Sequence, residues 1–240
     1  MTPPDGPLIA EFRPADSACD PRPSDQGVTW WESGGIPTQA PCYVQGTLIA
    51  TSRGEVPVET IRPGDQLVTP HLGNTALQPV VWVGHRHLRR LHRRANVASL
   101  APVRIMAGAL ADGVPQRDLC VSPDHAMFLD GRLVPAILLV NGTTIVQERH
   151  VTEVTYWHVE LPEHGLLLAE GAPSESYLDH GNRAQYAKRG VMTLLKHMLT
   201  TRDAGGYDAA ACFQPLRHGE ALEAIRDRLT ARAWGMRRRA

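Results

Sequence analysis

The pattern of apolar and polar positions divides the chain into three zones. Between residues 42 and 182, short runs of β-branched and apolar residues alternate with turn pairs such as Gly64-Asp65, Asp130-Gly131 and Asn141-Gly142. The predicted strands are 44–51, 55–59, 66–69, 80–84, 103–105, 119–122, 126–129, 143–147, 151–161 and 166–169. Many short strands at this spacing indicate an all-β fold of the closed or sandwich-like type.

The segments on either side have different patterns. Residues 1–41 are rich in Pro, Asp, Ser and Gly, and such a segment buries too little apolar surface to offset the entropy of ordering it. Apolar residues return at helical spacing in 187–199 and again in 222–233, which predicts two helices. We therefore expect a mostly disordered leader over 1–41, a β domain over 42–182 and a helical C-terminal extension over 183–240.

Composition and charge argue against several classes of protein. The chain has 240 residues, of which 42% are apolar, and this is enough for a sizeable core. Its formal net charge is zero and only 5% of its residues are aromatic, so no nucleic-acid partner is expected. It has no apolar run of about 18 residues for a membrane span, and no basic region followed by an apolar core for a signal peptide. A cytoplasmic location is the default expectation, and secretion by a signal-less route stays open.

The histidines and cysteines give one metal hypothesis, which competes with a simpler one. The four cysteines are widely spaced and form no Cys-x-x-Cys pair, so a zinc ribbon or thioredoxin-type motif is not predicted. His85, His87 and His92 lie close in sequence, and the first two share a face if this segment is a strand. Five arginines surround them in 84–94, and their positive charge opposes a divalent cation. We therefore predict a solvated basic loop here, with no metal and no other cofactor.

One cysteine stands in a position that suits nucleophilic chemistry. Cys42 begins a strand-like run, PCYVQGTLIAT (41–51), directly after the proline-rich leader. The tight turn SPDH (122–125) projects the His125 imidazole from a rigid position between two predicted strands. A thiol combined with imidazole and hydroxyl groups is typical of nucleophilic catalysis. Taken alone, such a cysteine is more often a small buried hydrophobic residue, and such a histidine is more often a surface residue.

Three motifs in order carry a resemblance to a known family. The first is the cysteine-aromatic opening at 42–43, continued by GT at 46–47, VE at 58–59, PGD at 63–65 and VT at 68–69. The second is SPDH at 122–125, followed by GRLVPA at 131–136. The third is YWHVE at 156–160, followed by HGLLLAEG at 164–171. Together they resemble the Hint family, the self-processing fold shared by Hedgehog C-terminal domains and inteins, and the bacterial subgroup with a single Hint module looks closest.

The resemblance implies a Hint fold and a reaction at the Pro41–Cys42 bond. In that reaction Cys42 attacks the Pro41 carbonyl carbon and converts the peptide bond into a thioester, an N-to-S acyl shift. By the same resemblance, His125 protonates the departing Cys42 nitrogen and Ser122 forms a hydrogen bond near the scissile peptide. His158 stands where inteins commonly have an aspartate that helps to activate the first cysteine. A protein of this kind acts once on itself and is not a turnover enzyme.

Two closing positions depart from the intein pattern and limit the expected reaction. Inteins end on His-Asn, whereas the corresponding positions here carry Glu175 and Ser176, which cannot cyclise as asparagine does. We therefore expect N-terminal cleavage or transfer without full splicing. The substrate is the protein's own N-terminal segment, and the acceptor is water or an unidentified small nucleophile. No nucleic acid and no membrane span are expected to take part.

A second hypothesis comes from the residue before the cysteine. The ring of Pro41 crowds the approach to its carbonyl, and carbonyl–carbonyl n→π* donation from the preceding amide lowers the electrophilicity of that carbonyl. The alternative reading is a Hint-like module that does not process itself and serves as a structural or binding unit.

Overall fold

The computed structural model of the protein describes residues 41–71, 74–94, 97–179 and 206–238. The predicted leader, apart from its last residue, and the predicted helix 187–199 lie outside the described residues. The strands are β1 (Tyr43–Val44), β2 (Leu48–Thr51), β3 (Gly54–Pro57), β4 (Gln66–His71), β5 (Asn74–Pro79), β6 (Trp82–Arg89), β7 (Val103–Ile105), β8 (Leu119–Val121), β9 (Ala126–Leu129), β10 (Arg132–Pro135), β11 (Ile145–Gln147), β12 (Glu153–Glu160), β13 (Leu166–Ala169) and β14 (Ala172–Glu175). The helices are α1 (Val97–Leu100), α3 (Gly206–Ala210) and α4 (Glu220–Arg237), with short 3₁₀ helices η1 (Val58–Thr60), η2 (Leu91–Arg93) and η3 (Ala136–Leu139).

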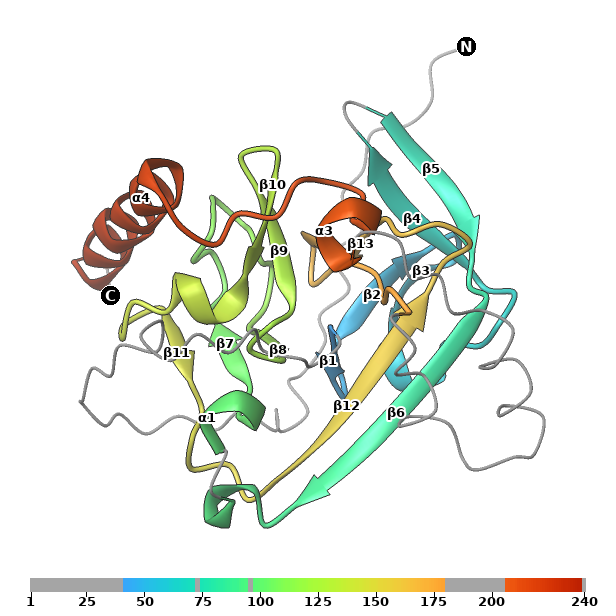
Figure 1. Ribbon diagram of the computed structural model, residues 1–240, viewed down its shortest axis with the longest axis horizontal. Helices are drawn as coiled ribbons and strands as arrows, with labels where there is room; N and C mark the ends of the chain where they lie inside the picture. Colours follow the sequence, from blue (N-terminus) through green and yellow to red (C-terminus); the bar gives the residue numbers. More distant parts are fainter. Residues whose placement is uncertain (1–40, 72–73, 95–96, 180–205, 239–240) are drawn as a thin grey trace.

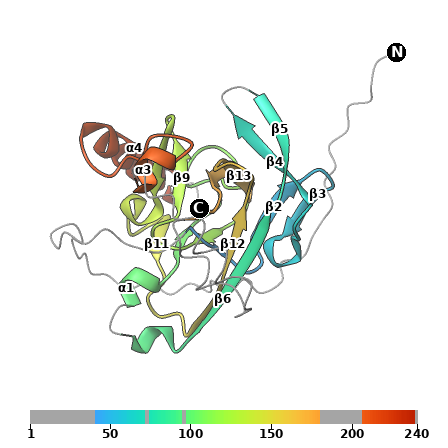
Figure 2. The same cartoon turned by 45° about the vertical axis from the view of Figure 1, so that its right-hand side comes forward.

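The described strands form two curled sheets, which confirms the predicted all-β class (Figure 1). One sheet has six strands in the order β11-β7-β8-β1-β12-β6. The other has eight strands, of which seven follow the order β10-β9-β14-β13-β2-β4-β5 while β3 pairs with β2. The chain passes from the first sheet to the second between β1 and β2. The long strands β6 and β12 run side by side along one flank, and the β4–β5 hairpin extends away from them (Figure 2).

Alternating side chains divide the interior into two apolar clusters. On β1, Tyr43 packs into the main core, whereas Cys42 and Val44 pack into a second cluster that also contains Leu91 and Tyr156. This is the two-residue period of a strand, in which successive side chains point to opposite faces. Because both faces of β1 are covered, its residues are almost fully buried. The thiol therefore lies inside the protein and not at its surface.

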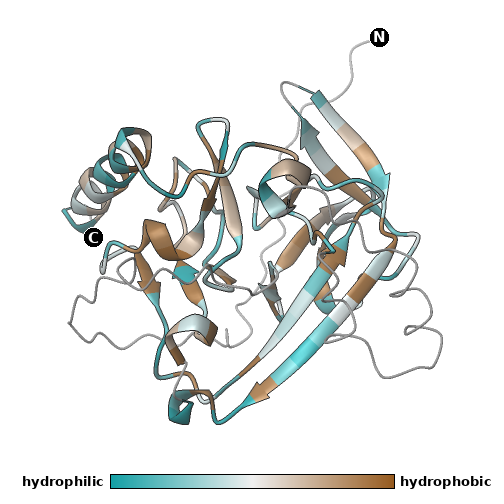
Figure 3. Cartoon of the chain, viewed as in Figure 1, coloured by the Kyte–Doolittle hydropathy of each residue, from teal (hydrophilic) through white to brown (hydrophobic). Residues whose placement is uncertain are grey.

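The basic run 84–94 corrects one prediction. We predicted a solvated loop, but most of the run belongs to β6, which pairs with β12 from Trp82↔Glu160 to Arg89↔Glu153. Its exposed middle is hydrophilic, as Figure 3 shows, because β6 is the edge strand of its sheet and directs these side chains to solvent. Charged residues on an edge strand also oppose pairing with another chain. The run of charged residues that indicated a loop in the sequence belongs to an exposed edge strand.

Three further strands had no clear signal in the sequence. β5 is exposed over most of its length, so it lacks the apolar alternation that identifies a half-buried strand. β10 and β14 each contain a proline, which lowers the expectation of a strand. The predicted strand 44–51 is interrupted at Gly46, where a turn with φ of 89° separates β1 from β2.

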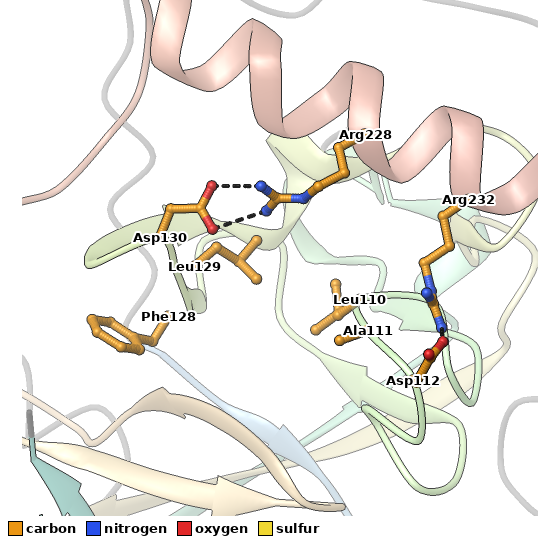
Figure 4. A pocket seen from close by; sticks show the side chains of 8 residues that line it. All are labelled: Leu110, Ala111, Asp112, Phe128, Leu129, Asp130, Arg228 and Arg232. Carbon is orange, nitrogen blue, oxygen red and sulfur yellow. Dashed lines mark hydrogen bonds and ion pairs between the residues drawn. The ribbon is translucent and has the colours of Figure 1, made fainter. Parts of the chain in front are cut away.

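The predicted C-terminal helix is present as α4. Its apolar stripe is buried, and the buried residues are Leu222, Ile225, Leu229 and Ala233. An open groove of about 550 Å³ lies beside it. Figure 4 shows the side chains that line this groove, which come from α4, from the loop 110–112 and from the end of β9 with Asp130. Arg228 and Arg232 reach from the helix to Asp130 and Asp112, with closest N–O distances of 2.7 Å in both pairs.

In the described part of the chain, no helix has the length and apolar character needed to cross a membrane.

We predict that Leu229→Ala lowers the free energy of unfolding by about 2–5 kcal/mol, because it leaves a cavity at a fully buried position of the main core. The control is Trp234→Ala on the same helix, where the indole is 58% exposed and the expected change is within about 0.5 kcal/mol. Urea denaturation measures both. Equal losses for the two variants would show that α4 is not packed through its apolar stripe.

Candidate active site

The register of β1 sets the geometry of the site. Tyr43 pairs with Val121 of β8 on one side and with Trp157 of β12 on the other, both antiparallel. In antiparallel pairing, the residue before Tyr43 lies opposite the residues that follow Val121 and Trp157. Cys42 is therefore flanked by Ser122 on β8's side and by His158 on β12's side, so that strand pairing places a hydroxyl and an imidazole on either side of it.

His158 contacts both the thiol and the peptide bond before it. Its Nε2 is 3.4 Å from Cys42 Sγ, and its Nδ1 is 2.8 Å from the carbonyl oxygen of Pro41. A carbonyl oxygen only accepts hydrogen bonds, so Nδ1 carries the proton and Nε2 presents a lone pair to the thiol. The ring is fully buried, and burial lowers the pKa of His158 to about 3 against the opposing effect of the Pro41 carbonyl. His158 is therefore a neutral imidazole at neutral pH.

Ser122 holds the other side of the same peptide. The N–H of Cys42 donates to Ser122 Oγ at 3.0 Å, and the N–H of Ser122 donates to the Cys42 carbonyl at 2.9 Å. The second bond continues the β1–β8 ladder by one residue, which fixes the backbone of Cys42. The hydroxyl thereby contacts the nitrogen of the Pro41–Cys42 bond, while His158 contacts its carbonyl oxygen.

His125 lies on the opposite face of β1. Its ring stacks edge-on against Tyr43 with centroids 4.4 Å apart, and its backbone N–H donates to the carbonyl of Ser122. Among the described residues, neither ring nitrogen has a hydrogen-bond partner within normal distance. Burial lowers the pKa of His125 to about 4, although the charge of Glu175 and the backbone of Cys42 act in the opposite direction. The structure thus brings His125 to the neighbourhood of Cys42 without direct contact to its nitrogen.

The thiol itself is protonated in the resting site. Burial is the largest influence on Cys42 and raises its pKa far above the ordinary value, although Ser122 acts to lower it. A resting thiolate is therefore not available, and any attack by sulfur needs a base that accepts the proton during the step.

Two aromatic rings enclose His158. Tyr177 meets the imidazole edge-on at 5.3 Å between centroids, and Trp82 lies 6.4 Å away on β6. Gly84 pairs with His158 across β6 and β12, and a Cβ on Gly84 would lie 2.2 Å from the Trp82 indole. The absence of a side chain at this position therefore allows the indole to lie over the strand and cover the site.

One buried acid near the site had no recognisable signal in the sequence. Glu175 is the last residue of β14, and its Oε1 accepts from the N–H of Ala126, the residue after His125, at 2.7 Å. It occupies the first of the two positions where we noted the lost asparagine, but the sequence did not show that its carboxylate reaches the histidine turn. A sequence pattern does not show that a polar residue such as Glu175, on a strand that contains a proline, is buried. The structure shows that it is.

The histidines of the metal hypothesis are not drawn together into a metal site. His85 stacks on Trp157 with centroids 4.7 Å apart, and His87 pairs with Thr155 and Glu153 on β12. His92 lies beyond the strand on η2. Within the described ranges, no group of three or more histidine, cysteine, aspartate or glutamate residues has the arrangement of a metal site.

Comparison with protein families identifies the domain to which this fold belongs. The profile of the Hint domain matches residues 41–181, more than half of the chain. The chain belongs to the Hint domain family. The match begins at Pro41, next to the thiol, and runs past β14, so it spans both sheets. No match was found among curated proteins.

Solved structures of Hint-type proteins resemble the chain at low identity. An intein-like domain from Clostridium thermocellum is 16% identical, with a TM-score of 0.38, over 56% of this chain and 97% of that one. The gp41-1 intein is 15% identical, with a TM-score of 0.40, over 57% and 98%. A DnaB intein from Synechocystis sp. is 8% identical, with a TM-score of 0.42, over 57% and 99%. The family assignment rests on the profile match.

We predict that acid destabilises this Hint domain through its two buried neutral histidines. Their pKa values are lowered from 6.5 to about 4 and about 3, so the unfolded chain binds protons that the folded chain does not. The contribution of these two groups to stability is therefore complete above pH 6.5 and is lost as the pH falls, on the order of 3 kcal/mol or more for each histidine. Urea denaturation between pH 7 and pH 4 measures this loss, with Cys42→Ala to keep the chain intact.

The control compares a buried with an exposed histidine. In the Cys42→Ala background, His158→Gln should flatten the dependence of stability on pH, whereas His92→Gln, at an exposed position, should leave it unchanged. An unchanged slope in His158→Gln would show that this ring is not held neutral by burial.

Proposed function

We propose that this Hint domain activates its own Pro41–Cys42 bond as a thioester and releases or transfers its N-terminal segment. The observation that carries the proposal is the double contact of this peptide by buried side chains. His158 Nδ1 is 2.8 Å from the carbonyl oxygen, and Ser122 Oγ is 3.0 Å from the nitrogen. The electrophile and the leaving group are thus both held, with the nucleophilic sulfur beside them.

His158 has two roles in the first step of this mechanism. Its Nε2 takes the proton from Cys42 as the sulfur attacks the Pro41 carbonyl carbon. Its Nδ1–H stabilises the negative charge that develops on the Pro41 oxygen, and the imidazolium that forms makes this bond stronger. Because burial keeps the thiol protonated, proton transfer and attack occur together.

The second step breaks the bond to nitrogen. The nitrogen of the tetrahedral intermediate is an amine and is far more basic than the amide it replaces, so it accepts a proton as it leaves. His125 is neutral in the resting site, so it first takes up a proton from solvent, and the imidazolium, with its lowered pKa of about 4, is then a strong acid that donates to the departing nitrogen. Ser122 keeps the nitrogen in place through its hydroxyl. The thiol loses one proton to His158, and the nitrogen gains the proton that His125 took from solvent. His125 thereby returns to its neutral form, and His158 then releases its extra proton to solvent.

The thioester is then open to attack by water or by a small thiol or amine, which frees the N-terminal segment. Glu175 and Ser176 stand at the two closing positions of the family pattern, and neither side chain cyclises as asparagine does. The proposed outcome is therefore N-terminal cleavage or transfer in a single event per molecule, without splicing.

We predict that incubation of the full-length protein with a small thiol at neutral to mildly alkaline pH yields a fragment that begins at Cys42. Cys42→Ala removes the nucleophile and should stay full length. Cys212→Ser is the matched control, because Cys212 is a second free thiol in the described part of the chain and should not be needed. Intact-mass spectrometry follows all three. If wild type and Cys42→Ala both remain full length, the autoprocessing proposal is wrong.

A second prediction separates the two roles of His158. Asparagine places an amide donor near the position of Nδ1, so His158→Asn keeps a hydrogen bond to Pro41 but provides no base for the thiol. We expect cleavage to slow by roughly 10²- to 10⁴-fold, the usual contribution of proton transfer. His85→Asn, at an exposed position of the neighbouring strand, is the control and should cleave at the wild-type rate. A wild-type rate in His158→Asn would contradict the role of His158 as base.

The alternative function is a Hint module that folds without processing itself. Two observations favour it: the acyl residue is Pro41, and burial raises the pKa of the Cys42 thiol far above neutral pH. The thiol experiment decides between the two functions, because a non-processing module stays intact in every variant.

A further inference from the structure

Glu175 is a carboxylate enclosed by the protein, with only 1% of its surface exposed. A buried carboxylate is costly unless donors surround it. Its position at the end of β14 places it where the β9 strand, the β13–β14 hairpin and the C-terminal segment meet. The groups that satisfy it therefore come from three separate parts of the chain.

Glu175 is hydrogen-bonded to the residue after His125 and to the residue after Cys42. Its Oε1 accepts from the Ala126 N–H at 2.7 Å, directly after His125. Its main-chain oxygen accepts from the Tyr43 hydroxyl at 3.1 Å, directly after Cys42. The Tyr43 ring in turn packs against the His125 imidazole. A single residue thus ties the turn that carries His125 to the strand that carries the nucleophile.

The second oxygen of Glu175 is held from the C-terminal segment. The hydroxyl of Tyr207, on α3, donates to Oε2 in a short hydrogen bond, and His164 Nε2 lies 3.4 Å from the same oxygen. Tyr207 is kept in place by Arg217, whose guanidinium lies 5.5 Å from its ring centroid and pairs with Asp208 at 2.8 and 2.9 Å. Without the hydroxyl, His164 is the remaining described side chain beside this oxygen, and we expect the carboxylate to turn toward it and away from Ala126.

The segment that carries Tyr207 is docked on the β domain by backbone pairing. Leu133 of β10 donates to the carbonyl of Gln214 and accepts from the N–H of Leu216, at 3.2 and 2.8 Å. Phe213 packs on Phe128 of β9 with centroids 4.5 Å apart. β9 begins at Ala126, whose N–H is bonded to Glu175. The C-terminal segment therefore packs, through Phe213, on the same strand that Glu175 contacts.

We infer that Glu175 and Tyr207 are positioning residues of the autoprocessing site, and that the C-terminal segment 206–217 is therefore part of the processing apparatus. This inference rests on the proposed function. Neither residue touches the reacting atoms. They act on the backbone beside His125, so that its ring keeps its place against Tyr43 in the neighbourhood of Cys42.

The test measures single-turnover thiol cleavage of the full chain with Glu175→Gln and Tyr207→Phe. Glutamine keeps the shape and one acceptor oxygen but removes the charge, and phenylalanine keeps the ring but removes the donor. A displaced catalytic group costs up to about 10²-fold in rate, so we expect Glu175→Gln to slow cleavage by roughly 10- to 100-fold and Tyr207→Phe by several-fold. Thr69→Val is the matched control, because it removes a buried hydroxyl bonded to the Ala76 carbonyl in the distant β4–β5 hairpin and should leave the rate unchanged.

A second readout distinguishes positioning from mere loss of stability. In the full-length Cys42→Ala background, NMR titration of the His125 ring should show a lower pKa in Glu175→Gln, because the charge of Glu175 raises it. Faster hydrogen exchange of the Ala126 amide is expected in both variants. Urea denaturation of the same proteins shows whether each variant remains folded.

The outcomes separate this inference from the proposed function. If wild type does not cleave, the proposed function fails and the inference fails with it. If wild type cleaves and both folded variants cleave at its rate, only the inference is overturned. If Thr69→Val slows cleavage as much as Tyr207→Phe does, the effect is one of stability and the positioning role is wrong.

Discussion

The pairing of β1 with two neighbours at once is the constraint on which the site depends. This strand has only two residues, yet it lies between β8 and β12 and is hydrogen-bonded to both. A slip of one residue on either side would turn Cys42 to the other face and separate it from Ser122 or His158. The buried Tyr43 opposes such a slip, since its hydroxyl is bonded to Ser174 and to the Glu175 carbonyl.

The site that results is buried, and its thiol and imidazoles are neutral at neutral pH. The thiol, both imidazoles and the scissile peptide are buried together, so a mechanism that begins with a thiolate or an imidazolium has to overcome the cost of a buried charge. In the proposed mechanism, proton transfer from Cys42 to His158 during attack avoids separating charge before the bond forms. The same burial strengthens the hydrogen bond from His158 to the Pro41 oxygen, because the local dielectric is low.

The sequence was sufficient for the fold class and the family, because the relevant signals are local. The structure places Ser122 and His158 beside Cys42, whereas the roles of these residues stay predictions. A cysteine before a strand, a histidine in a turn and a histidine within YWHVE are all visible in short windows. The edge strand β6 was misjudged because its charges face solvent, and β5 and β14 lack apolar alternation. The sequence marks Glu175 only as the first of the two closing positions, since its contacts to Ala126 and Tyr207 join residues far apart in the chain. The proposed boundaries of the leader and of the C-terminal extension remain predictions.

The burial of Cys42 bears on what would happen to the product of the proposed cleavage. Cutting before Cys42 replaces an uncharged amide with a terminal amine whose ordinary pKa is about 7.7–8.0, in a place that is 3% exposed. A cation there is poorly solvated, and the imidazole that faced the departed carbonyl has lost its acceptor. The new chain end gains free energy by moving out into water, where the amine takes up a proton. That movement would dismantle the geometry needed to rejoin the two pieces, so a single cut becomes effectively one-way.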